Sequence, residues 1–337
     1  MHFLITGHTG FKGTWLALLL MERGHQVSGI SLNPESNSLF QKANIGNLLN
    51  HDIRCDIRDL EDLERQFNRI KPDIVIHLAA QALVRQSYEH PISTFETNVI
   101  GTINVLKASQ SVSGLKAQLI ITTDKVYRNQ KKISGYSESE PLGGRDPYSA
   151  SKAMADIATQ SWLSSFVNVP TAIARAGNVI GGGDVCADRL IPDLINSYVS
   201  RLTPRLRAPN SVRPWQHVLD CLNGYLLLLD AVVIGNAEGA WNFGPLQSQS
   251  RTVADVANIA GRLWGVEENW VYDEGDHPHE TDLLVLNSEK ARIDLGWMEK
   301  LTFEENIEWT INWYKAVHNG ANPLAQTLKN IRDFESL

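Results

Sequence analysis

The fold of this chain is decided near its start, by the run HFLITGHTGFKGTWLALLL at residues 2–20. The run reads as a buried apolar strand, a glycine turn and an apolar helix, in that order. Gly7 permits the tight turn, Gly10 lets a pyrophosphate approach the backbone N–H groups of the helix, and Gly13 allows the helix to pack closely on the strand. The spacing G-x-x-G-x-x-G differs from the G-x-G-x-x-G of ordinary dinucleotide-binding folds, and a glycine turn alone is a weak signal.

Short apolar strands alternate with helix-length segments through the first half of the chain. This alternation is typical of a parallel sheet covered by helices. We therefore predict an α/β fold, with a Rossmann-type doubly wound parallel sheet and a smaller C-terminal α/β domain that binds the substrate. The predicted strands cover residues 2–5, 26–32, 52–56, 73–80, 118–123 and 171–175.

After residue 175 the alternation weakens, and prolines at positions 192, 204, 209 and 214 interrupt the chain. We place a domain boundary at this point. The predicted cofactor-binding domain covers residues 1–175 and is rejoined by about 214–244, and the predicted substrate domain covers 176–213 and 245–337.

Two groups of ionisable side chains indicate proton-transfer chemistry. Tyr148 and Lys152 are four residues apart, so they fall on one face of a helix, where the ammonium can lower the pKa of the phenol from about 10 toward neutrality. Such a phenolate can take a proton from a sugar hydroxyl. Thr123, Asp124 and Lys125 end an apolar strand, and they add an acid and a second ionisable group that a simple alcohol dehydrogenase does not need.

The composition excludes several classes of protein. The chain has 337 residues, a net charge of −7 and three cysteines. A mildly acidic chain is a poor binder of nucleic acid, and no apolar run approaches the roughly 20 residues of a membrane span. The cysteines are scattered without C-x-x-C spacing, and no His, Cys or carboxylate cluster has metal-ligand spacing. Because the first strand begins at residue 2, we expect no signal peptide, and we predict a cytoplasmic location with no metal, nucleic acid or membrane partner.

Several longer motifs resemble the extended short-chain dehydrogenase/reductase family, and within it the CDP-glucose 4,6-dehydratase family. These motifs occupy residues 6–13, 142–149, 176–184, 188–193 and 213–218, with Pro278-His279-Glu280 nearer the C-terminus. The resemblance extends over nearly the whole chain. Several long motifs in the same order are a specific signal, which the glycine loop alone is not.

The resemblance implies a reaction that needs no net redox change. NAD would oxidise the C4 hydroxyl of glucose, with Tyr148 as base and Thr123 hydrogen-bonded to the same oxygen. The new ketone acidifies the C5 proton, and a base removes it while Asp124 protonates the leaving C6 hydroxyl. Asp124 must then be neutral, with a pKa well above its reference of about 3.9. Lys125 is either the C5 base, with its pKa lowered by desolvation, or a cation that stabilises the enolate.

The resemblance also implies the binding residues. Asn98 matches a position that holds the catalytic lysine through water. Asn33 replaces the acidic residue that binds the adenosine ribose, yet no arginine follows it to hold a 2′-phosphate, so we predict NAD; Lys12 leaves NADP open. The predicted cofactor-binding residues are Gly7, Thr9, Gly10, Phe11, Lys12, Gly13, Asn33, Asp56, Ile57, Leu78, Ala79, Ala80, Asn98, Tyr148 and Lys152. The predicted substrate-binding residues are Gln81, Asn178, Arg189, Arg213, Trp215 and His217.

Three kinds of function remain open at this point. The first is the dehydratase that acts on a nucleotide sugar. The second is a sugar-nucleotide 4-epimerase or reductase on the same fold, which would use Tyr148 and Lys152 but not an acid at Asp124. The third is a non-catalytic protein that binds a sugar nucleotide. We also predict a C₂ homodimer, because the long helices expected at residues 94–109 and 149–166 match the pair that forms the dimer interface in the resembled family.

Overall fold

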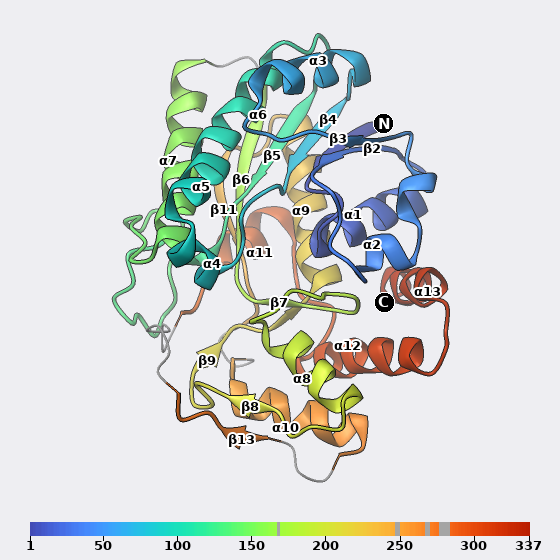
Figure 1. Ribbon diagram of the computed structural model, residues 1–337. Helices are drawn as coiled ribbons and strands as arrows, with labels where there is room; N and C mark the ends of the chain where they lie inside the picture. The colour runs from blue at the N-terminus through green and yellow to red at the C-terminus, as the bar shows by residue number, and fades with distance from the viewer. Residues whose placement is uncertain (167–168, 247–249, 267–269, 276–283) are drawn as a thin grey trace.

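A computed structural model of the chain describes residues 1–166, 169–246, 250–266, 270–275 and 284–337, so the motif at residues 278–280 lies outside the described residues. The centre of the molecule is a seven-stranded parallel sheet with the order β11-β6-β5-β4-β1-β2-β3 (Figure 1). The predicted Rossmann-type doubly wound sheet is thus confirmed. Its strands are β1 His2–Thr6, β2 Gln26–Ser31, β3 His51–Arg54, β4 Ile74–His77, β5 Ala117–Ile121, β6 Thr171–Ala176 and β11 Gly239–Phe243.

Helices cover both faces of this sheet (Figure 1). One face packs against α1 and α9 through a core that includes Trp15, Leu219 and Phe243, and the other packs against α3 and α6 through Phe67 and Val105. The helices are α1 Phe11–Glu22, α2 Leu39–Lys42, α3 Leu60–Ile70, α4 Val84–Glu89, α5 Pro91–Phe95, α6 Gly101–Gln110, α7 Pro147–Ser165, α8 Leu190–Val199, α9 Val218–Val233, α10 Val253–Trp264, α11 Glu289–Leu295, α12 Phe303–His318 and α13 Pro323–Glu335. Shorter turns are η1 Ile45–Leu48, η2 Glu96–Ile100 and η3 Asp124–Val126.

The structure departs from two expectations about these elements. The sequence indicated six strands, and the seventh, β11, pairs with β6 at the edge of the sheet. The helix expected at residues 94–109 is present within a continuous helical segment, but the sequence did not indicate the π-helical turn η2 that lies in it between α5 and α6. A π-helical turn often marks a functional position, and η2 carries Asn98 with its side chain buried.

A second apolar cluster lies below the sheet in Figure 1, where α8, α10 and α12 pack together. Its members include Leu194, Val256 and Ile307. The chain also forms three small sheets, each made of two two-residue strands. They pair β7 Val179–Ile180 with β10 Gln216–His217, β9 Val212–Arg213 with β12 Arg251–Thr252, and β8 Arg205–Leu206 with β13 Val271–Tyr272. The boundaries predicted between two domains stay a prediction.

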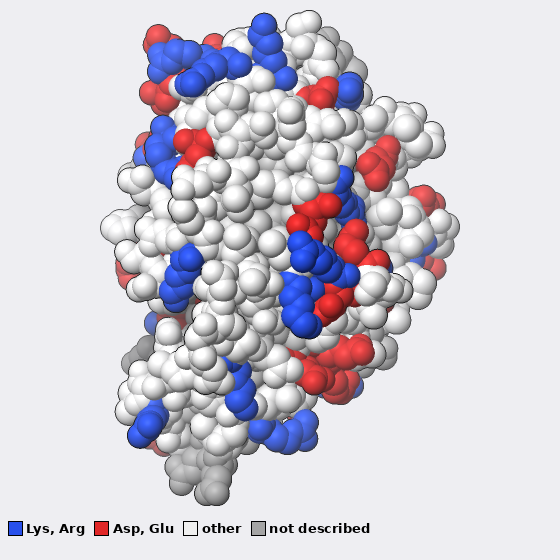
Figure 2. Space-filling view, turned by 90° about the vertical axis from the view of Figure 1, so that its right-hand side faces the viewer, with Lys and Arg blue, Asp and Glu red and all other residues white. Residues whose placement is uncertain are grey.

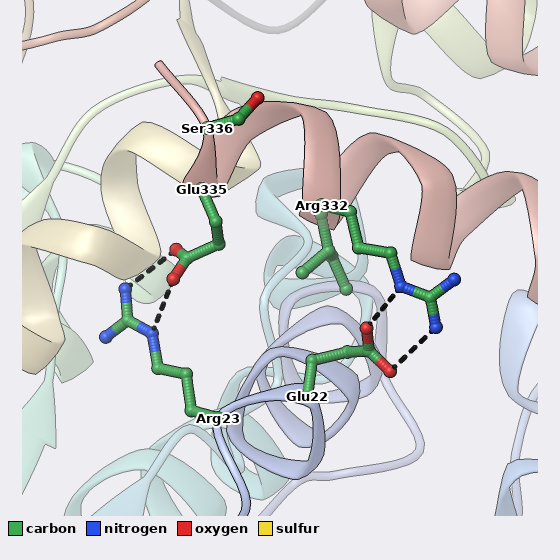
Figure 3. Close-up of a pocket in the computed structure, with 6 residues that line it drawn as sticks. Glu22, Arg23, Arg332, Glu335 and Ser336 are labelled. Atoms are coloured by element: carbon green, nitrogen blue, oxygen red, sulfur yellow. Dashed lines mark hydrogen bonds and ion pairs between the residues drawn. The ribbon is translucent and has the colours of Figure 1, made fainter.

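The C-terminal helix α13 lies on α1, where basic and acidic side chains alternate on the surface (Figure 2). Arg23 pairs with Glu335 at 2.9 Å and Arg332 with Glu22 at 2.7 Å, and these residues line a surface pocket (Figure 3). Exposed ion pairs of this kind contribute little to stability. The two arginines are paired with two glutamates, so the pocket has no excess of positive charge that would attract an anionic ligand. None of the described helices has the length and apolar character needed to cross a membrane.

Candidate active site

The predicted site residues follow four neighbouring strands of the sheet. The glycine loop follows β1, residues 78–81 follow β4, residues 123–125 follow β5, and Asn178 follows β6. Parallel strands end at one edge, and the chain order reverses between β1 and β4, which is where ligands bind in such sheets. Helix α7 packs against η3 and brings Tyr148 and Lys152 to the same edge.

The glycine loop fits a dinucleotide diphosphate. Gly7 has φ +79°, and a Cβ atom there would lie 2.7 Å from the backbone nitrogen of Ala79. A Cβ atom on Gly13 would lie 2.2 Å from the carbonyl oxygen of Gly7, so α1 begins as close to β1 as only glycine allows. At Gly10, in contrast, a Cβ atom would meet only that same oxygen, at 3.4 Å. Gly10 is the residue before α1, and no side chain caps the helix there. The backbone N–H groups at the N-terminus of α1 can therefore bind an anion.

Residues at the ends of β2 and β3 border the expected adenosine position. Thr9 hydrogen-bonds Ser31 at 2.7 Å and so ties the glycine loop to the end of β2. Asn33 is exposed just beyond it. Asp56 accepts hydrogen bonds from the side chain of Arg58, which hold the pKa of Asp56 below its usual range. Arg58 is not among the residues predicted from the sequence, because a single arginine beside a strand end is usually a surface residue.

The π-helical turn places Asn98 between two parts of the site. Its Oδ1 accepts from the backbone nitrogen of Gln81 at 2.8 Å, and its Nδ2 donates to the hydroxyl of Ser151 at 2.8 Å. Asn98 therefore links the segment after β4 to α7, one residue before Lys152. The side chain of Gln81 bonds the backbone of Leu83 and the hydroxyl of Thr94, so its contacts within the chain are structural.

Two lysines point into the site. Lys152 is 5% exposed, and its Nζ donates to the carbonyl oxygen of Ile121, at the end of β5, over 2.8 Å. Burial, together with the charge of Lys12, lowers the pKa of Lys152 to about 7. The Nζ of Lys12 lies 3.4 Å from the hydroxyl of Tyr225 on α9, which turns Lys12 toward the reaction centre. This orientation removes the reason for assigning Lys12 to the 2′-phosphate of NADP.

The expectation that Lys152 lowers the pKa of Tyr148 is wrong. Burial raises the pKa of Tyr148 to about 12, while a hydrogen bond with Thr123 and the charge of Arg189 oppose this rise. The physical reason lies in Lys152, whose ammonium is directed to a carbonyl oxygen and is itself easily deprotonated. A second lysine also lies beside the phenol: the Nζ of Lys125 is 5.9 Å from the centre of the Tyr148 ring.

Asp124 has the environment of a neutral carboxylic acid. It is 2% exposed, and burial raises its pKa against the opposing charges of Lys125 and Arg213. Its Oδ1 accepts from the hydroxyl of Thr123 at 2.9 Å. Its Oδ2 is buried and has no hydrogen-bond partner among the described residues. A Cβ atom at Gly177 would lie 3.2 Å from Oδ2, so this glycine keeps the space beside the acid open.

The predicted substrate residues fall into two groups. Asn178, Arg189 and Arg213 are partly exposed beside the site, and Arg189 donates to Asp184 at 2.9 Å. Trp215 and His217, in contrast, are buried. Their role in binding stays a prediction, since the structure accounts for both as packing residues.

The buried pair has clear structural partners. The indole of Trp215 donates to the carbonyl oxygen of Arg251 at 3.1 Å. His217 caps α9 by accepting from the backbone nitrogen of Leu219, and its ring packs edge-on against Trp15 and Trp309. Burial lowers the pKa of His217 to about 3, so it stays neutral at physiological pH.

Comparison with known proteins identifies the family to which the chain belongs. Residues 4–310 match the family described as GDP-mannose 4,6 dehydratase. The chain belongs to this family. It is 42% identical to the CDP-glucose 4,6-dehydratase of Salmonella typhimurium, over 98% of this chain and 95% of that protein. Identity to the dTDP-glucose 4,6-dehydratase of Shigella flexneri is 26%, over 95% of this chain and 94% of that protein.

Solved structures share the fold across several activities. The dTDP-glucose 4,6-dehydratase of Bacillus anthracis in complex with NAD matches with a TM-score of 0.80 at 23% identity, over 96% of this chain and 99% of that one. The UDP-glucose 4-epimerase of Thermus thermophilus in complex with NAD also matches at 0.80, with 25% identity over 94% of this chain and 99% of that one. The predicted membership of the extended short-chain dehydrogenase/reductases, and of their sugar-nucleotide 4,6-dehydratases, is confirmed.

The lowered pKa of Lys152 predicts a pH-dependent stability. Between its folded pKa of about 7 and its ordinary value of 10.5, the unfolded chain binds more protons than the folded one, so stability should rise with pH across that window. Lys152→Met removes this dependence. The unfolding temperature of the wild type minus that of Lys152→Met should therefore increase from pH 6 to pH 9. Lys42→Met, at an exposed lysine, is the control, and a difference that stays constant with pH would contradict the assignment.

Proposed function

We propose that this protein converts CDP-glucose to CDP-4-keto-6-deoxyglucose and water, with NAD as its cofactor. The observation that carries the proposal is the buried Asp124, whose pKa is raised by burial and whose second carboxyl oxygen has no hydrogen-bond partner among the described residues. An epimerase or reductase has no step that needs this acid. Greater identity to the CDP-glucose enzyme than to the dTDP-glucose enzyme supports the cytidine nucleotide.

The oxidation step uses residues of β5 and α7. NAD, when bound at the glycine loop, supplies a hydride acceptor for C4 and a donor for C6. Thr123 and Tyr148 share the C4 oxygen, and Tyr148 takes the hydroxyl proton. Because burial opposes ionisation of Tyr148, we infer that the hydrogen bond with Thr123 and the positive charge of Arg189 stabilise the phenolate. We infer that Arg189 also meets the substrate diphosphate together with Arg213 and Asn178.

The elimination step uses the residues that directly follow Thr123. Asp124 delivers its proton to the C6 hydroxyl as water leaves. Lys125 either removes the C5 proton or stabilises the enolate that forms. Its position over the Tyr148 ring places it on the same side of the site as the base for C4.

The proposed function predicts a preference for one nucleotide sugar. Purified protein supplied with NAD should release a product lighter by one water from CDP-glucose, in preference to dTDP-, UDP- and GDP-glucose. Mass spectrometry of each reaction checks this. Equal turnover of dTDP-glucose would overturn the nucleotide assignment, a product of unchanged mass would indicate an epimerase, and binding without turnover would indicate a non-catalytic protein.

Asp124→Asn separates oxidation from elimination. The amide keeps the shape of the side chain and removes the acid, so loss of water should slow by about 10²–10⁴-fold, the usual contribution of general acid catalysis. Oxidation at C4 should continue, and NADH absorbance should accumulate in single-turnover experiments. If substrate binds and NADH never accumulates, Asp124 is not the acid of this step.

Substitutions at Lys125 distinguish its two roles. If Lys125 is the C5 base, Lys125→Met should abolish exchange of the C5 proton with deuterated solvent while oxidation at C4 continues. If it is an electrostatic stabiliser, exchange should persist at a reduced rate. Lys125→Glu supplies a different base at this position, so partial recovery of exchange would support the first role. Loss of oxidation as well as exchange would contradict both.

We also propose that the protein is a C₂ homodimer. Ile100 at the end of η2 and Met154 and Ile157 on α7 are exposed apolar residues on elements that contact one another. A second copy of the chain would cover this face. Light scattering at micromolar concentration should give twice the chain mass, and Ile157→Glu should reduce it to the monomer. Ile293→Glu, at an exposed isoleucine on α11, is the matched control, and a monomeric wild type would contradict the proposal.

The cellular location follows from the proposed substrates. Nucleotide sugars and NAD are solutes of the cytoplasm, and we infer that the protein acts there. Its three cysteines, Cys55, Cys186 and Cys221, are all free thiols, which suits a reducing compartment.

A further inference from the structure

A buried ion pair is hydrogen-bonded to both ends of the segment that carries the proposed acid. Arg175 on β6 and Asp156 on α7 are 1% and 0% exposed in their side chains. The guanidinium donates twice, from Nε to Oδ2 at 2.8 Å and from Nη2 to Oδ1 at 2.7 Å. A buried pair of this kind is weak support for stability, because desolvation offsets the attraction of the charges. When every member is hydrogen-bonded, however, such a network can fix one arrangement of the groups around it.

The carboxylate of Asp156 bonds one end of the proposed catalytic segment. The hydroxyl of Thr122 donates to its Oδ2 at 3.1 Å, and Thr122 immediately precedes Thr123. Asp156 also lies one helical turn after Lys152 on α7. This carboxylate therefore connects the helix that carries Tyr148 and Lys152 to the strand end that leads into residues 123–125.

The guanidinium of Arg175 bonds the other end of the same segment. Its Nη1 donates to the hydroxyl of Tyr127 at 2.8 Å, and that hydroxyl donates to Oδ1 of Asn242 on β11 at 2.7 Å. Tyr127 is 1% exposed and comes two residues after Lys125, directly beyond η3. Residues 123–125 thus lie between two attachment points, Thr122 and Tyr127, and both are bonded to one ion pair.

We propose that the Asp156–Arg175 pair, acting through Tyr127, positions Asp124 and Lys125 for the elimination step. The three residues of this network act as positioning residues, because their hydrogen bonds are to other residues of the chain: Tyr127, Arg175 and Asp156. The inference rests on the proposed dehydratase function. Oxidation at C4 depends on Tyr148, which lies on α7, and on Thr123, which directly follows Thr122. The backbone nitrogen of Thr122 donates to the carbonyl oxygen of Ala174 on β6 at 2.8 Å, a bond that does not involve Tyr127. Loss of the Tyr127 hydroxyl should therefore affect elimination more than oxidation.

Tyr127→Phe tests the proposal, because it removes only the hydroxyl that links Arg175 to the segment. We expect loss of water and exchange of the C5 proton to slow by about 10–100-fold, the order of effect produced by a misplacement of up to 1 Å. Appearance of NADH should slow by less than about 3-fold under the same single-turnover conditions, and KM for CDP-glucose should stay close to that of the wild type. NADH should therefore accumulate in the variant.

Tyr136→Phe is the matched control. The Tyr136 ring stacks on that of Tyr127 with 5.2 Å between centroids and is also buried, but its hydroxyl bonds Gln130 and Asn129 instead of the ion pair. It should leave the ratio of elimination to oxidation unchanged. Thermal unfolding of both variants measures any general loss of stability.

A second variant covers the case in which Tyr127→Phe does not fold. Thr122→Val removes the side-chain attachment at the other end of the segment with little change in shape. The backbone bond from Thr122 to the carbonyl oxygen of Ala174 at 2.8 Å remains and keeps Thr123 in place for oxidation, so this variant should produce the same selective loss of elimination. The proposal would be overturned if the variant that folds had the same ratio of elimination rate to oxidation rate as the wild type. It would also be overturned if Tyr136→Phe lowered this ratio as much as that variant does. A wild type that binds CDP-glucose without releasing water would instead overturn the proposed function, and this inference with it.

Discussion

The close packing of helix α1 on strand β1 is the constraint on which the rest of the structure depends. A Cβ atom at Gly13 would lie 2.2 Å from the carbonyl oxygen of Gly7, so only glycine lets the helix begin so near the turn that follows the strand. This closeness brings the N-terminal N–H groups of α1 to the carboxyl edge of the sheet, where they can bind a diphosphate. It also directs Lys12, one residue earlier, toward Tyr225 and the reaction centre.

Burial then sets the protonation of the groups at that edge. It raises the pKa of Asp124 and lowers that of Lys152 to about 7, so each group shifts toward its neutral form. Proton-transfer chemistry needs such groups, because an acid must hold its proton until the leaving group departs. The pair of Asp156 and Arg175 shows the other response to burial. In this pair the two side chains are buried as an ion pair that is hydrogen-bonded to its neighbours. We infer that the pair holds those neighbours in place and does not donate a proton.

The sequence was a sufficient guide where a signal is local. Strands such as β1, β4 and β5 contain apolar runs followed by polar residues, and the glycine loop has a spacing that can be recognised. Strand β11 could not be found in this way, because its place depends on pairing with the distant β6. The spacing of Tyr148 and Lys152 predicted a shared helix face correctly, but it could not show that the lysine turns to the carbonyl oxygen of Ile121. The role of Tyr127 likewise depends on partners from three separate elements.

The fold alone does not distinguish a dehydratase from an epimerase, since solved structures of both match this chain with a TM-score of 0.80. The difference must lie in how precisely a few groups are placed. An epimerase acts at C4 only, so the segment after β5 needs to present little more than Thr123 to the sugar. Elimination needs an acid at C6 and a proton acceptor or cation at C5, and both groups must be placed correctly relative to the same sugar ring. Attaching that segment at Thr122 and at Tyr127 meets this stricter requirement, which gives a physical reason for placing a fully bonded ion pair behind it.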